Sequence, residues 1–94
     1  MKYNSASDID AMGYDRVIEN DSTGESYLMR LDPSRYNPES NIPALEQPIW
    51  QIKKVIEVTA NGEVTTDIKF ANGTDGYCHK ASEAKNYTYK YRED

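Results

Sequence analysis

The stretch "IWQIKKVIEVTANGEVTTDIKF", residues 49–70, decides the fold. Apolar and polar residues alternate with a period of two along both of its halves, and this alternation is typical of β-strands. Between the halves lies Asn61-Gly62, the strongest short sequence signal for a hairpin turn. We therefore predict a central β-hairpin whose strands cover about residues 48–59 and 64–71.

The length of the turn determines the register of this hairpin. A two-residue loop, Asn61-Gly62, pairs Val58 with Thr65, whereas a three-residue loop that includes Ala60 pairs Val58 with Val64. A slip of one residue turns every side chain of a strand to the opposite face. Only the three-residue loop collects the apolar side chains of both strands on one face. The pattern therefore predicts a type I turn with a bulge at Gly62.

A third strand is predicted near the C-terminus, over residues 86–92. There Tyr87, Tyr89 and Tyr91 share one face, and this spacing favours either a packed ladder against a neighbouring strand or a tyrosine-rich binding face. Residues 80–85 predict one short helical turn. Together with the hairpin these segments form a predicted β core over residues 48–94.

The N-terminal half predicts less regular structure. Residues 1–13 are polar and lack periodicity, so we expect a flexible arm. Residues 14–31 predict a short β-hairpin around a turn rich in Asn, Asp, Ser and Gly. Residues 32–48 hold all four prolines and predict an extended segment, which is either a surface loop or an arm on a neighbouring subunit. The predicted fold class is mainly β, a small antiparallel sheet with extended arms and little helix.

Composition excludes several classes of function. The formal net charge of −5 argues against a nucleic-acid binder, whose affinity comes mostly from Lys and Arg on phosphates. The chain has no apolar run long enough to cross a membrane. Leu, Ile, Val and Phe are few, whereas tyrosines number eight. We infer a thin core that gains stability by packing on partner proteins.

The chain has one cysteine and one histidine, Cys78 and His79, and they are adjacent. Neighbouring side chains of an extended segment point to opposite faces, which disfavours a nucleophile and its base. Zinc commonly takes four ligands, and the glycines form no phosphate-binding motif. We therefore predict no enzyme, with no catalytic residue, no cofactor and no metal site. Cys78 is interpreted as a small apolar thiol and His79 as a surface imidazole.

Three segments of the C-terminal half carry a resemblance to a known family. They are "IWQIKKV" (49–55), "FANGTDGY" (70–77) and "YTY" (87–89). They resemble small proteins encoded among the structural genes of tailed bacteriophages. That family has a Trp-Asp-x-Arg-Ala run where this chain has "ASEAK" (81–85), so that Ala81 stands in the place of the Trp.

The resemblance implies a non-enzymatic accessory structural protein located in the virion, at the head–tail connector, the tail, a fibre-attachment site or the capsid surface. Its expected partners are other virion proteins in multiple copies, and neither nucleic acid, membrane nor a small-molecule substrate. Large aromatic residues contribute much of the binding energy of protein interfaces. We therefore hypothesise that five residues contact partner proteins, and call this the interface hypothesis: Tyr36, Trp50, Tyr87, Tyr89 and Tyr91. The alternative is a small acidic phage-encoded inhibitor that binds a host protein.

Overall fold

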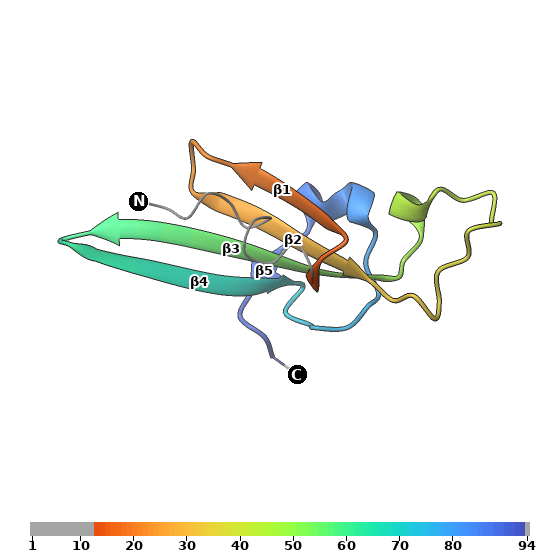
Figure 1. Cartoon of the computed structure of the whole chain (residues 1–94). Helices are drawn as coiled ribbons and strands as arrows, with labels where there is room; N and C mark the ends of the chain where they lie inside the picture. The colour runs from red at the N-terminus through yellow and green to blue at the C-terminus, as the bar shows by residue number, and fades with distance from the viewer. Residues whose placement is uncertain (1–12, 94) are drawn as a thin grey trace.

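The computed structural model describes residues 13–93, which form one antiparallel sheet with the strand order β1-β2-β3-β4-β5 (Figure 1). The elements are β1 Arg16–Asn20, β2 Glu25–Leu31, the 3-10 turn η2 Ala44–Glu46, β3 Trp50–Ala60, β4 Glu63–Ala71, the 3-10 helix η3 Ala81–Asn86, and β5 Tyr89–Lys90. The mainly β prediction is confirmed, including both hairpins. Of the predicted arm, residues 1–12 lie outside the described part of the chain.

The register of the central hairpin differs from the prediction. Ala60 pairs with Glu63 and Val58 with Thr65, so the loop is Asn61-Gly62 alone and the predicted bulge is wrong. Asn61 has φ 54° and Gly62 has φ 80°, as in a type I′ turn, whose twist matches that of the flanking strands. The turn therefore sets the register, and apolar and polar side chains mix on both faces of the hairpin.

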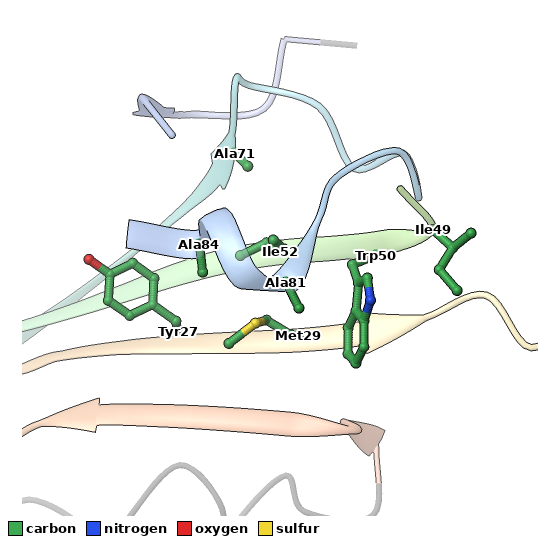
Figure 2. Packing of buried hydrophobic residues seen from close by; sticks show 8 residues of the cluster. All are labelled: Tyr27, Met29, Ile49, Trp50, Ile52, Ala71, Ala81 and Ala84. Carbon is green, nitrogen blue, oxygen red and sulfur yellow. The ribbon is translucent and has the colours of Figure 1, made fainter. Parts of the chain in front are cut away.

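The core lies on one face of the sheet and is covered by η3 (Figure 2). Met29 of β2 and Ile52 of β3 pair across the two central strands and are fully buried. Ala81 and Ala84 of η3 pack onto them and are also buried. The small alanine side chains let the backbone of η3 approach the sheet closely, since a larger residue there would lift it away.

Residues 32–48 form a loop that projects from the end of the sheet, returns to it and is closed by its own hydrogen bonds, which favours the surface-loop alternative (Figure 1). Gln47, near the end of this segment, is buried and binds three of its backbone groups. Its side-chain Nε2 donates to the backbone oxygens of Asn37 (3.1 Å) and Ile42 (2.9 Å), and its Oε1 accepts the Asn37 N–H (3.2 Å). The Arg35 guanidinium donates to the oxygen of Tyr77 at 2.7 Å. These bonds replace the backbone partners that a proline-rich segment cannot find in a ladder.

The C-terminal strand is shorter than the predicted 86–92. Only Tyr89 and Lys90 pair with β4, opposite Ala71 and Phe70. Before them the chain forms η3, and after them the Glu93 N–H donates to the oxygen of Gly73 at 2.8 Å. Of the three alternating tyrosines, only Tyr89 lies within the strand, whereas Tyr87 precedes it and Tyr91 follows it.

Two glycines with similar φ angles provide a matched test of the way the β1-β2 hairpin packs against β3. Gly24 has φ 72° and Gly62 has φ 80°, but a Cβ on Gly24 would stand 2.7 Å from the Glu57 oxygen, whereas one on Gly62 would meet nothing within 4 Å. Both Gly→Ala variants are expected to lose about 1–2 kcal/mol because L-residues disfavour this conformation. Gly24→Ala should lose at least about 1 kcal/mol more through the clash.

The measurement is urea unfolding of both variants and the wild type, followed by circular dichroism. Equal losses in the two variants would contradict the close approach of Gly24 to Glu57.

Candidate interaction surface

The outer half of the β3-β4 hairpin projects past the rest of the sheet (Figure 1). The last β3 residue that pairs with β2 is Ile56, opposite Glu25, and the Glu57 N–H donates to the Gly24 oxygen at 3.0 Å. Beyond this point residues 57–66 form a ribbon of two strands, which we call the distal ribbon. Among residues 13–93, neither η3 nor β2 reaches along it, so no described element covers either face of the ribbon.

The distal ribbon and the strand just behind it hold three exposed β-branched residues. Val58 is 53% exposed, Val64 58% and Ile68 48%. The observed register places Val64 and Ile68 on one face and Val58 on the other, which is the face of the core residue Ile52. Single exposed apolar residues are ordinary. Three on one projecting hairpin, with no described side chain covering them, form the best candidate for a contact with another protein.

The inner part of the face that carries Ile68 is occupied by contacts within the chain. The Lys53 ammonium lies 5.1 Å from the ring centre of Tyr14 and 5.8 Å from that of Phe70. The Arg30 guanidinium lies 4.9 Å from the same Tyr14 ring. Such cation–π contacts stabilise these four side chains against one another. The apolar surface still available on this face is therefore that of Val64 and Ile68.

Tyr91 stands where β5 ends beside β4. Its hydroxyl hydrogen-bonds the Asp67 carboxylate, and this bond and the charge of the carboxylate raise the pKa of Tyr91 above its ordinary value. The Lys69 ammonium lies 5.1 Å from the centre of its ring. Tyr91 remains more than half exposed, so among the five tyrosine and tryptophan residues of the interface hypothesis it is the most accessible one.

The other members of the interface hypothesis lie in different surroundings. Trp50 is 3% exposed, and its indole N–H donates to the Ala44 oxygen at 3.0 Å, so it serves the core of the chain itself. Tyr89 packs edge to face on Tyr27, and burial raises its pKa. Tyr87 accepts the Lys80 N–H at 2.9 Å. Tyr36 is partly exposed, on the 32–48 loop. The structure does not gather these residues into one surface patch.

The sequence did not single out Val58, Val64 and Ile68, because alternation marked them as core residues. The one sequence feature that could have indicated their exposure is Asn61-Gly62. Its preference for a two-residue turn sets a register in which each face of the hairpin carries both apolar and polar side chains. Apolar residues on both faces of a ribbon cannot all lie in a core that covers one face.

The Cys78-His79 pair is closer than the sequence predicted. Cys78 Sγ lies 3.8 Å from His79 Nδ1, and His79 Nε2 lies 3.3 Å from the side-chain nitrogen of Asn72. Cys78 is exposed, but the interpretation of His79 as a surface imidazole is wrong, since it is only 5% exposed. The order thiol, imidazole and amide is that of a Cys-His-Asn nucleophile set.

The surroundings of this set indicate a structural role. His79 forms a bridge with Trp50, since the backbone N–H of each donates to the oxygen of the other at 3.0 and 2.9 Å. Its ring packs edge to face on Tyr87 with 4.6 Å between centres. The N–H groups of Gly76, His79 and Lys80 already donate within the fold, so they are not free to stabilise an oxyanion beside Cys78.

The described part of the chain shows no other chemical centre. Within residues 13–93 no three His, Cys, Asp or Glu side chains converge where a metal ion could bind. A groove of about 350 Å³ between β1 and η3 is lined by Arg16, Ile18, Ala81, Ser82, Ala84, Lys85 and Asn86. This lining holds no acid, histidine or cysteine. In the same residues no helix is long and apolar enough to span a membrane.

Comparison with known proteins adds no assignment: no protein-family model, no curated protein and no solved structure matches this chain.

The buried His79 predicts a pH dependence of stability. Burial lowers the pKa of His79 below its ordinary value of 6.5, and its neighbours Cys78, Asn72 and Tyr87 supply no carboxylate. The folded chain therefore stays neutral at this site while the unfolded chain gains a proton below pH 6.5. Stability is fully present above pH 6.5 and is lost as the pH falls toward the lower folded-state pKa.

The free energy of unfolding in urea should thus be lower at pH 5.5 than at pH 7.5. Aspartate and glutamate contribute little in this window because their ordinary pKa values lie near 4. In His79→Gln the difference between the two pH values should shrink. An unchanged difference in the variant would show that another group causes it.

Proposed function

We propose that this protein is an accessory structural component of a tailed-phage virion and acts by packing on neighbouring virion proteins. The observation that carries the proposal is the projecting β3-β4 hairpin, which exposes Val58, Val64 and Ile68. β-Branched side chains on an open ribbon are suited to packing against another protein surface. The covered side of the sheet supplies a core that holds this hairpin in place.

The tailed-phage part of the proposal rests on the resemblance of residues 49–55, 70–77 and 87–89. In the fold these three segments come together around the core. They contribute Trp50 and Ile52 of β3, Ala71 at the end of β4, and Tyr89 of β5, which pairs with Ala71. The resemblance therefore concerns residues that build the core of the fold. The exposed residues of the distal ribbon lie outside it, so partner choice would be particular to this chain.

The alternative function, a small acidic inhibitor of a host protein, would favour a surface of one charge sign. Along β3 and β4 acids and bases are interspersed: Lys53, Lys54 and Glu57 on one strand, Glu63, Asp67 and Lys69 on the other. Lys54 also lies 3.5 Å from the Glu25 carboxylate. This mixture supports assembly by shape and apolar contact over steering by charge.

Quantitative mass spectrometry of gradient-purified particles tests the proposal, with the chain and its variants expressed in the infected host. Ile68→Lys places a charge on the exposed apolar face and should lower the amount in particles by about tenfold or more, since burying an unpaired charge costs well over 1.4 kcal/mol. The control is Asn41→Lys, an exposed residue of the 32–48 loop, away from the hairpin. It should be incorporated like the wild type.

A chain that is abundant in the lysate but absent from particles would contradict the proposal and favour the inhibitor. A catalytic role predicts that Cys78→Ser abolishes function, whereas the structural role predicts normal incorporation of this variant.

A further inference from the structure

The outer edge of β4 has no partner over most of its length. β5 pairs only with Phe70 and Ala71, and among the described residues no strand pairs with Glu63–Lys69 from that side. The ladder with β3 runs without a bulge over this stretch, and the stretch contains no proline. Natural sheets usually interrupt or cover such an edge. A regular seven-residue edge is therefore a place where another strand can add.

The backbone groups that point outward from this edge follow from the register. In a two-residue hairpin the pair that flanks the loop, here Ala60 and Glu63, is hydrogen-bonded, and bonded pairs then alternate with unbonded ones. Odd-numbered β4 residues therefore bond to β3, and even-numbered ones point outward. The even-numbered Asn72 agrees with this assignment, because its N–H points to the β5 side and donates to the Thr88 oxygen at 2.7 Å. An added strand would bond to Val64, Thr66 and Ile68.

We propose that the partner of this edge is the β4 edge of a second copy of the chain, paired antiparallel about a two-fold axis through Thr66. The sequence of β4 is complementary to itself in this register. Glu63 lies opposite Lys69 of the second copy, and Val64 lies opposite Ile68 of the second copy. Because the pair is symmetric, each of these contacts occurs twice. The central Thr66 faces its own counterpart.

Neighbouring registers lack this complementarity. The outward-pointing backbone groups of one copy must face those of the other copy. The two-fold axis must therefore pass through a residue, and the register can shift only by moving the axis to a neighbouring residue. A centre at Thr65 sets Glu63 against Asp67, and a centre at Asp67 sets that carboxylate against itself. Like charges directly opposite each other are destabilising. Only the centre at Thr66 pairs opposite charges and uses the whole free edge.

The end of β5 sets the limit of this arrangement. Lys90 occupies the position opposite Phe70, one residue beyond Lys69. The second copy's strand would begin with Glu63 opposite Lys69, and its Gly62 would come opposite Phe70, where Lys90 already lies, so the turn of the second copy must bend out of the plane of the sheet there. The two sheets would then join into one continuous sheet. Val64 and Ile68 of both copies would form a single apolar row on one of its faces.

Sedimentation of the purified full chain, over about 10 µM to about 1 mM, tests the proposal, because an edge-to-edge contact of this size is expected to dissociate in that range. The wild type should dimerise. Glu63→Lys alone and Lys69→Glu alone should each raise the dissociation constant by about tenfold, since two attractive contacts become repulsive. An equimolar mixture of the two variants should dimerise like the wild type, because both Glu–Lys contacts return in the mixed pair.

Thr66→Pro provides an independent variant. It removes an N–H that points away from β3, and proline is tolerated on such an edge, so the hairpin should fold while dimerisation is lost. A wild type that stays monomeric throughout the range would overturn the proposal and leave the edge to a strand of a different protein. Dimerisation that none of these changes affects would overturn it as well, since the contact would then lie elsewhere.

Discussion

The packing of η3 onto β2 and β3 is the contact on which the rest of the structure depends. Ala81 and Ala84 close one face of the sheet over Met29 and Ile52, and these four residues lie at the centre of the core (Figure 2). A chain with so few large aliphatic residues can build one such core and no more. Trp50, Tyr27 and Tyr89 extend this core at its margins, and the 32–48 loop is attached to it through Trp50 and Ala44.

The limited reach of this core explains the open surfaces. Lys54 and Lys69 lie opposite each other on β3 and β4, at the boundary between the core and the distal ribbon. Each finds a separate neighbour, Lys54 the Glu25 carboxylate and Lys69 the Tyr91 ring. Beyond them the hairpin has no cover from η3, and its β-branched side chains are left exposed. The apolar contact and the free edge proposed for assembly are therefore consequences of a core that ends early.

The packing around this small core also explains the candidate for reactive chemistry within residues 13–93. His79 is buried because its backbone bridges to Trp50 and its ring packs on Tyr87. The imidazole therefore helps attach the segment before η3 to the start of β3. Its proximity to Cys78 is a result of this attachment, and the nearby backbone donors are already engaged in it.

The sequence by itself determined the strands and the positions of the turns, because alternation and Asn61-Gly62 are local properties that need no partner. The predicted three-residue loop was wrong, since it followed the apolar pattern and not the preference of Asn-Gly for a two-residue turn. The sequence also determined that β5 would join the hairpin and that one short helical turn would precede it. Three things were decided by the tertiary structure: the exposure of Val58, Val64 and Ile68, the burial of Trp50 and His79, and the folding of residues 32–48 around Gln47. Each depends on which part of the sheet η3 and the loops bury. The alternation of apolar and polar residues along a strand does not show how far along the strand this burial extends.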